Sequence, residues 1–499
     1  MSEPKKESRR RFLKYGAGVV AVGVVAAAGY GVYQMSQPGP APPTPSTTSA
    51  ASTASSATTT VAPPTTAVGK PWEGQSIHAA MTNVPGTDQI LSYVPSFQNQ
   101  YNIQLSHEYF SSDAVREKTL IDFEGHTKQY DVVMTGTDFT PLFTSGNMIV
   151  PLDQYINDPS IAEPDQLALD DIVDAFRGMG QFNGVEYELP HYGESTFTFW
   201  RTDLYEKYGL SEPKTTDDLW HNAETIFKGE KGKVFGITLR GRRGQGENCY
   251  TYAPVMRAFG ARFFKDYPKD LTPTLDSSEN LAALKWYSGI LQNFAQPGVA
   301  GMGVMDCLVD DQKGIVAQGM EATPIIHYIY KNKDSAFPDA WKAMPAMPCA
   351  PGYSVDKEKP MELYCWNWAI NADVDDKRKM AAFKWMQFAT GQKTTSNLWK
   401  GVDLPTPFLY RGAVTRKSVL ALPQIQAEKD VWVDAFLYSA MNADVEIRPR
   451  IPEWPDIGDI VGLYLQDTIA GGAKPEYAVA RMQDEVERIV KAAKYPPYA

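Results

Sequence analysis

The sequence has few cysteines and little positive charge. It holds four cysteines in 499 residues and no C-x-x-C pair, which excludes a disulfide scaffold and argues against a zinc site. Lys and Arg number 48 against 59 Asp and Glu, and this acidic balance (net charge −11) argues against a nucleic-acid partner. One stretch alone is apolar enough to lie in a membrane, so a multi-span permease is excluded.

Common catalytic motifs are also missing. The sequence contains no G-x-x-x-x-G-K-[ST] phosphate loop, no G-x-S-x-G and no H-E-x-x-H, and its six histidines stand far apart. A Ser-His-Asp triad and a pair of glycosidase carboxylates stay open, because their members need not be close in sequence. We predict a protein that is not an enzyme, with no catalytic residue, no cofactor and no metal.

The N-terminus is typical of an export signal. Residues 1–14 carry six basic and two acidic residues, a net +4, which leaves −15 on the remainder. Residues 8–14, S-R-R-R-F-L-K, resemble a twin-arginine signal, and residues 15–33 contain nothing but Gly, Ala, Val and Tyr. We predict that residues 1–35 are this signal, retained as a membrane anchor on the extracellular or periplasmic side. A plain anchor with a basic inside flank is the alternative.

Residues 36–71 are rich in Ser, Thr, Ala and Pro, with eight prolines. Such a segment buries too little apolar surface to offset its ordering entropy. We predict a disordered stalk that holds a folded body away from the membrane.

From about residue 72 the sequence becomes typical of a globular α/β protein, since 43% of the chain is hydrophobic. Alternating or apolar runs predict strands at 76–81, 103–109 and 131–134, and helical spacing predicts helices at 88–101 and 475–493. This alternation favours largely parallel sheets. About 430 residues follow the predicted stalk, which is more than a single hydrophobic core usually holds. We therefore expect two lobes.

Three clusters combine aromatic, amide and carboxylate groups at turns. They are E-L-P-H-Y-G-E-S at 188–195, L-R-G-R-R-G-Q-G-E-N at 239–248 and Y-C-W-N-W at 364–368. Rings offer flat apolar faces and planar polar groups offer directed hydrogen bonds, a combination that suits sugars and polyols.

With these clusters the chain resembles the family-1 extracellular solute-binding proteins of ABC importers, from about residue 72 to the C-terminus. Residues 190–195 and 239–248 are similar to segments of sorbitol- and mannitol-binding members, and so are G-M-E-A-T at 319–323 and W-N-W at 366–368. Three positions depart from those members: His191 replaces an aromatic residue, Gln245 replaces Trp, and Glu321 replaces Asp.

The resemblance implies a two-lobed periplasmic-binding-protein-like fold with hinge crossovers near 194–198, 362–366 and 411–414. The N-terminal lobe would comprise 72–193 plus 367–412, and the C-terminal lobe 194–366 plus 413–499. It also implies capture of a sugar or polyol in the interlobe cleft, and delivery to a membrane permease that works with a cytoplasmic ATPase. We expect a monomer.

Eleven residues are predicted to contact the ligand. Several have a structural alternative: core packing for Trp366 and Trp368, helix capping for Asp138 and Asn248, and an ordinary surface position for the two glutamates. The set is Asn83, Asp138, His191, Tyr192, Glu194, Arg240, Asn248, Glu321, Thr323, Trp366 and Trp368.

Other functions stay open. A surface-anchored glycoside-active enzyme, an adhesive surface module, and a binder of oligosaccharide, peptide or anionic sugar each fit part of the pattern. Cys349 and Cys365 flank a Pro/Gly turn region, so a disulfide between them is also a possibility.

Overall fold

The computed structural model describes residues 70–84, 87–402 and 411–498. The predicted signal and anchor, and nearly all of the predicted stalk, lie outside these ranges. No helix within them is both long and apolar enough to cross a membrane.

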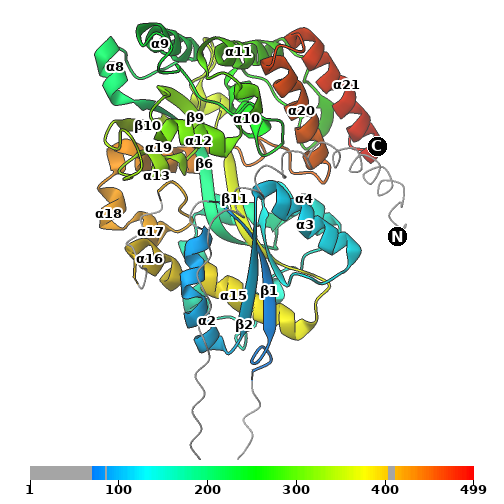
Figure 1. Cartoon of the computed structure of the whole chain (residues 1–499). Helices are drawn as coiled ribbons and strands as arrows, with labels where there is room; N and C mark the ends of the chain where they lie inside the picture. The colour runs from blue at the N-terminus through cyan, green and yellow to red at the C-terminus, as the bar shows by residue number, and fades with distance from the viewer. Residues whose placement is uncertain (1–69, 85–86, 403–410, 499) are drawn as a thin grey trace, which may run out of the picture. The chain divides into compact units, whose positions relative to one another are not determined.

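The described chain folds into strands and helices that alternate over most of its length (Figure 1). The strands are β1 (Ser76–Thr82), β2 (Gln104–Phe110), β3 (Val132–Gly136), β4 (Gln181–Phe182), β5 (Val185–Glu186), β6 (Leu189–Arg201), β7 (Phe264–Asp266), β8 (Asp270–Pro273), β9 (Gln318–Ala322), β10 (Trp341–Pro345) and β11 (Leu363–Ile370). The α-helices are α2 (Val94–Tyr101), α3 (Ser112–Gly125), α4 (Thr140–Ser145), α5 (Asp153–Ile156), α6 (Pro164–Leu167), α7 (Asp174–Met179), α8 (Thr202–Tyr208), α9 (Thr216–Gly229), α10 (Asn248–Ala258), α11 (Ser278–Phe294), α12 (Val304–Gln312), α13 (Ile325–Ile329), α14 (Val355–Glu358), α15 (Asp376–Thr390), α16 (Gln392–Lys400), α17 (Lys417–Leu420), α18 (Pro423–Gln426), α19 (Asp434–Asn442), α20 (Trp454–Ile469) and α21 (Pro475–Ala493). Three short 3₁₀ helices, η1 (Thr87–Tyr93), η2 (Leu169–Asp171) and η3 (Val299–Gly301), and one π-helical turn, η4 (Lys429–Val433), complete the set.

The elements with the clearest periodicity are confirmed. The predicted helix at 475–493 is α21, and the predicted strands match β1, β2 and β3 to within two residues. The predicted helix at 88–101 is divided into η1 and α2, with Pro95 in the first turn of α2. Proline has no amide hydrogen to donate, and its ring clashes with the carbonyl one turn earlier, so a continuous α-helix cannot run through it.

The expectation of largely parallel sheets is wrong. In the main sheet the order is β10-β6-β11-β3-β1-β2, with β9 also paired to β6. β1 is parallel to β2 and β3, but β11 is antiparallel to both of its neighbours, and β9 and β10 are antiparallel to β6. β6 and β11 therefore run in opposite directions between the two parts of the fold, which a local hydrophobic pattern cannot reveal.

β6 passes from one lobe to the other. Its residues Leu189–Ser195 pair with β11, and the following Thr196–Arg201 pair with β9 and β10. We call the part with β1, β2, α3 and α15 the first lobe, and the part with α9, α10, α11, α20 and α21 the second lobe (Figure 1). β3, which pairs with β1, and α7, which packs on β6 and β11, also belong to the first lobe. Most of the apolar side chains of the second lobe form a hydrophobic core of their own.

Hydrogen bonds tie together three segments that cross between the lobes. The Ser195 hydroxyl donates to the Glu362 carbonyl (2.6 Å), and the Glu362 amide donates to the Thr196 hydroxyl (2.9 Å). The Thr323 hydroxyl accepts from the Ser195 amide (3.2 Å) and donates to the Gly412 carbonyl. Thr323 thus braces the crossovers, and hinge motion at the three predicted segments remains a prediction.

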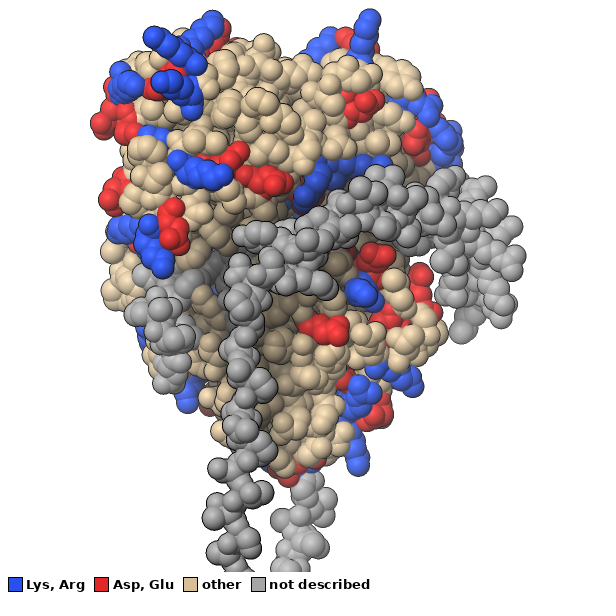
Figure 2. Space-filling view, viewed as in Figure 1, with Lys and Arg blue, Asp and Glu red and all other residues tan. Residues whose placement is uncertain are grey.

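Two other features concern cysteine and surface charge. All four cysteines are buried and free, so the disulfide considered for Cys349 and Cys365 does not form. Basic and acidic side chains are interspersed over the face shown in Figure 2. Exposed pairs such as Lys285–Glu476 (2.7 Å) neutralise part of the acidic surface.

Candidate functional site

A buried polar centre lies where the loop after β3 meets the loop before α10. Asp138 follows β3 and is 8% exposed. It accepts hydrogen bonds from the Tyr364 hydroxyl of β11 (2.7 Å) and from the side-chain amide of Gln245, which precedes α10. Arg116 of α3 approaches the same carboxylate (3.3 Å) and also donates to the Tyr364 hydroxyl (2.7 Å). Asp138 thus connects the two lobes through its side chain.

Asp138 is held as a carboxylate. Burial alone would raise its pKa, but the nearby Arg116 and Arg448, together with hydrogen bonds from Tyr364 and Gln245, lower the pKa below its ordinary value. The structure places this charge at the contact between the lobes. A carboxylate there accepts hydroxyl protons more strongly than a neutral acceptor would.

Arg448, in the segment between α19 and α20, donates to Gln245 (3.3 Å) and to Glu362 (2.9 Å). We call Arg116, Asp138, Gln245, Tyr364 and Arg448 the cleft network. Burial raises the pKa of Glu362 to about 7, although Arg448 opposes the shift.

Arginines and aromatic rings alternate through the centre. The Arg448 guanidinium lies 5.0 Å from the ring centre of Tyr364 and 5.2 Å from that of Tyr250, and Arg240 lies 4.6 Å from the Tyr250 ring. These distances are those of cation–π contacts. In the same way the Arg116 guanidinium lies 5.1 Å from the Trp366 ring. The rings hold the guanidinium groups in place without neutralising them.

Arg240 forms a buried ion pair with Glu321. Its Nε donates to Glu321 (2.8 Å), its Nη2 donates to the other carboxylate oxygen, and its Nη1 donates to the Gly246 carbonyl (2.7 Å). Glu194 lies nearby on β6. Burial and the charge of Glu321 raise the pKa of Glu194 to about 7, against the opposing effect of Arg240.

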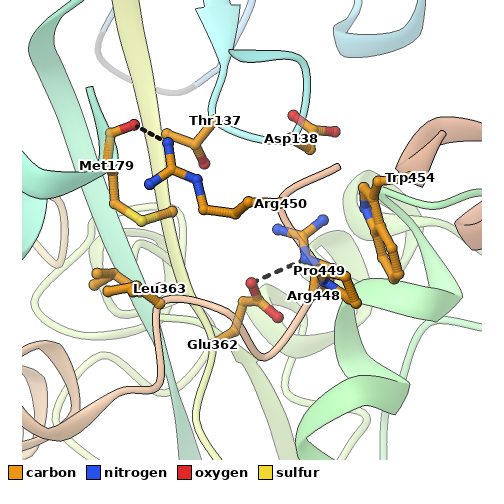
Figure 3. A pocket seen from close by; sticks show the side chains of 10 residues that line it. Thr137, Asp138, Met179, Glu362, Leu363, Arg448, Pro449, Arg450 and Trp454 are labelled. Carbon is orange, nitrogen blue, oxygen red and sulfur yellow. Dashed lines mark hydrogen bonds and ion pairs between the residues drawn. The ribbon is translucent and has the colours of Figure 1, made fainter. Parts of the chain in front are cut away.

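A small cavity adjoins the cleft network. Its volume is about 10 Å³, enough for about one water molecule. Figure 3 shows Arg448 reaching Glu362 and Arg450 reaching the main chain of Met179 on the wall of this cavity. The remaining lining residues are Thr137, Asp138, Leu363, Val445, Pro449 and Trp454. Beside this cavity, Gln245 and Asp138 meet across the contact between the lobes.

The structure brings five of the predicted residues to this centre: Asp138, Glu194, Arg240, Glu321 and Trp366. Each is at most 9% exposed. The two glutamates are therefore not ordinary surface residues.

The other predicted residues lie in different surroundings. Asn83 is exposed at the end of β1. Asn248 is the first residue of α10 and donates to the carbonyls of Gly241 and Gly462 instead of capping the helix. Thr323 braces the crossovers, as described above. Trp368 packs in the core against Trp385, with ring centres 5.8 Å apart.

His191 and Tyr192 lie on β6 beside β11. His191 is half-buried, with its ring edge-on to Trp368 (6.0 Å), and burial lowers its pKa to about 4, which makes it neutral at pH 7. Tyr192 is buried and opposite Trp366 in the ladder.

Several residues of the centre were not predicted from the sequence. They are Arg116, Tyr250, Glu362, Tyr364, Arg448, Arg450 and Trp454. Tyr364 lies within a cluster already singled out, and the R-P-R run at 448–450 is the one available signal for the two later arginines. Arg116 has no local signal, because it lies on a helix with charged residues along its length.

Two lobes joined by crossing strands, with a buried polar centre between them, define a two-lobed binding protein. Residues 83–395 match the family model described as bacterial extracellular solute-binding protein. The chain is 24% identical over 409 residues to the mannitol-binding protein of Pseudomonas aeruginosa, covering 79% of this chain and 88% of that protein.

Solved structures share the fold. An ABC transporter solute-binding protein of Agrobacterium vitis with bound D-mannitol is 25% identical, with a TM-score of 0.73 over 85% of this chain and all of the other. One from Agrobacterium radiobacter in complex with ribitol is 24% identical, with a TM-score of 0.74 over 84% of this chain and all of the other. The chain belongs to the family of bacterial extracellular solute-binding proteins, which confirms the predicted family.

Proposed function

We propose that this protein captures a polyol or a small sugar between its lobes and delivers it to the permease of an ABC importer. The function is binding and not catalysis. The similarity to mannitol-binding and mannitol-bound proteins supports the ligand class. The twin-arginine signal, the anchor and the stalk predicted in residues 1–71 would tether the binding lobes outside the membrane as a monomer.

One observation carries the proposal. Within the described residues, three buried side-chain atoms on the cavity wall or beside it make no hydrogen bond: Glu362 Oε2, Arg450 Nε and Trp454 Nε1. The first is an acceptor and the other two are donors. A hydroxyl both donates and accepts, so a polyol supplies what each of these atoms lacks. Leaving such groups unpaired costs about 1–3 kcal/mol each, and a matched solute recovers that free energy.

The size of the cavity requires the lobes to open. Pockets for small ligands are typically ~300–1,000 Å³, far larger than the present space of about 10 Å³. Solute entry must therefore separate Asp138 from Gln245, and closure then rebuilds the contacts around the solute. The predicted lobe boundaries and hinges describe this motion.

Thermal unfolding against a ligand panel tests the proposal. We expect a polyol or a monosaccharide to raise the melting temperature, since a ligand at one hundred times its Kd stabilises the folded state by about 2.7 kcal/mol. Disaccharides, uronates and short peptides complete the panel. The proposal fails if no polyol or sugar shifts the melting temperature, or if an oligosaccharide is converted to product on long incubation, which would favour a glycoside-active enzyme.

Solute affinity is expected to rise about tenfold between pH 6 and pH 8. Glu362 has a pKa of about 7, so its ionised fraction, the form that accepts a hydroxyl proton, grows about tenfold over this interval. Arg448, Asp138 and Asp444 are the charged groups that act on it. Isothermal titration calorimetry at both pH values measures the change. Glu362→Gln should bind more weakly and without this pH dependence.

The free energy of unfolding of the ligand-free protein should fall as the pH rises, whereas the affinity for solute rises. The pKa of Glu362 is raised on folding, so its contribution to stability is present below the unfolded pKa of about 4.5 and is lost as the pH rises through about 7. Glu194 titrates in the same window, beside Arg240 and Glu321. Glu194→Gln separates the two groups: the pH dependence of binding that remains in this variant should be that of Glu362. An affinity that is flat from pH 6 to pH 8 in the unaltered protein would contradict the assignment to Glu362.

A further inference from the structure

Arg450 links the lobes without a carboxylate partner. It lies in the segment before α20, and its guanidinium donates to three main-chain carbonyls of the first lobe: Gly178 (3.2 Å), Met179 (3.1 Å) and Gln181 (2.7 Å). Within the described part of the chain it forms no ion pair. Figure 3 shows the side chain extending past the cavity toward Met179.

The acceptors lie at the C-terminal end of a helix. Gly178 and Met179 are the last two residues of α7, and Gln181 begins β4 after the intervening Gly180. The final carbonyls of a helix lack intrahelical partners and carry the negative end of its dipole, so a guanidinium is favourable there. Arg450 therefore adds, from the opposite lobe, hydrogen bonds to the carbonyls at this helix end and at the start of β4.

Both ends of this contact are rigidly held. On the second lobe, the Tyr267 hydroxyl donates to the Arg450 carbonyl (3.1 Å), and Ile447 and Ile451 on either side are buried in the second core. On the first lobe, Phe176 and Met179 of α7 are buried in the first core. The main chain on each side of the contact is therefore fixed within its own lobe.

We propose that Arg450 is a positioning residue that couples solute capture to lobe closure. Its Nη1 and Nη2 atoms fasten the closed lobes through the end of α7. Its Nε atom is buried, makes no hydrogen bond within the described residues and belongs to a residue that lines the cavity. A hydroxyl-bearing solute and the α7 carbonyls thus use different atoms of one planar group. The part played by Nε rests on the proposed function, whereas the fastening by Nη1 and Nη2 does not.

Distance measurements on the ligand-free protein test the fastening. Spin labels are placed on cysteines introduced at Ile121 of α3 and Tyr477 of α21, which are 59% and 57% exposed and lie on different lobes. The four native thiols are buried, and burial raises the pKa of each, so they compete little for the label. Double electron–electron resonance then reports the distribution of distances between the lobes.

Arg450→Met should lose most of the short-distance population, and Arg450→Lys should lose part of it, because an ammonium group cannot reproduce the planar fork. Arg243→Met is the matched control. Arg243 is an exposed arginine of the second lobe that pairs with Asp459 of the same lobe, so its loss should leave the distances unchanged. The inference is overturned if Arg450→Met retains the distribution of the unaltered protein, or if Arg243→Met changes it equally.

Solute binding provides the second readout. For a ligand identified by the panel, Arg450→Met should weaken affinity at least tenfold, since affinity falls in proportion to the closed fraction. An unchanged affinity overturns the coupling. If no polyol or sugar binds the unaltered protein, the proposed function fails, but the distance measurement still decides whether Arg450 fastens the lobes. If Arg450→Met does not fold, the distance distribution of Arg450→Lys decides whether Arg450 fastens the lobes: an unchanged distribution would overturn the inference.

Discussion

Asp138→Asn is expected to lower the free energy of unfolding by about 3–5 kcal/mol, the cost typical of breaking a buried ion pair. Asp138 is the carboxylate that accepts from Tyr364 and Gln245 and faces Arg116. An asparagine has one acceptor oxygen in place of two. Its amide N–H groups would face the donor groups of its neighbours, with which they cannot form hydrogen bonds. The Arg116 guanidinium, on a residue that is 8% exposed, would lose its buried counter-charge and keep only the exposed Asp113 (3.4 Å).

Solute affinity should fall at least a hundredfold in the same variant, because a charged acceptor facing the solute is lost and a factor of one hundred is only about 2.7 kcal/mol. Urea denaturation and titration calorimetry measure the two effects. Asp459→Asn is the matched control: Asp459 also pairs with an arginine, Arg243, but both side chains are more than 40% exposed. Such surface pairs contribute about 0–1 kcal/mol. Equal losses in the two variants would show that Asp138 has no special role.

Local patterns predicted the regular elements well. α21 has apolar residues spaced three and four apart and no proline after its first turn, so its limits follow from the sequence alone. The direction of β6 and β11 does not follow from such patterns. Pairing depends on where distant segments meet, and alternation along a strand is the same for parallel and antiparallel neighbours.

The candidate site was predicted only in part, because its residues come from segments that are distant from one another in the sequence. Asp138 was predicted because it follows a strand, and Glu194, Arg240, Glu321 and Trp366 were predicted from segments that resemble the family. Arg116 and Arg448 reach the same centre from a surface helix and from a late loop, separated by more than 300 residues in sequence. Trp368 shows the converse: it shares a cluster with Trp366, yet its ring packs against Trp385 in the core.

Three of the residues that were missed, Arg116, Glu362 and Arg448, are buried charged side chains. Arginines in a sequence normally indicate solvent-exposed positions, since a charged side chain is seldom fully buried unless it is paired. Here the pairing comes from acids on other elements, as in Arg448–Glu362 and Arg116–Asp138. The same acids and arginines that hold the closed lobes together are the groups that the proposed solute must contact.

The Arg240–Glu321 pair is expected to show the second large effect. Glu321→Met should lower the free energy of unfolding by about 3–5 kcal/mol, because it leaves the Arg240 guanidinium buried without its bidentate partner. Arg240→Met should cost a similar amount. The double variant should cost clearly less than the sum, since replacing both members of a buried pair by apolar residues removes the unpaired charge.

Glu194 provides an independent readout of the same pair. The charge of Glu321 helps to raise the pKa of Glu194, and Arg240 acts to lower it. In Glu321→Met the first influence disappears and the second remains, so the pKa of Glu194 should fall below about 7. Carbon-13 NMR titration of the glutamate carboxyls measures this shift. Glu224→Met, which breaks the exposed Lys228–Glu224 pair, is the control and should change neither the pKa of Glu194 nor stability by more than about 0.5 kcal/mol. Additive losses in the double variant, or an unchanged pKa of Glu194, would mean that Arg240 and Glu321 do not act as one buried unit.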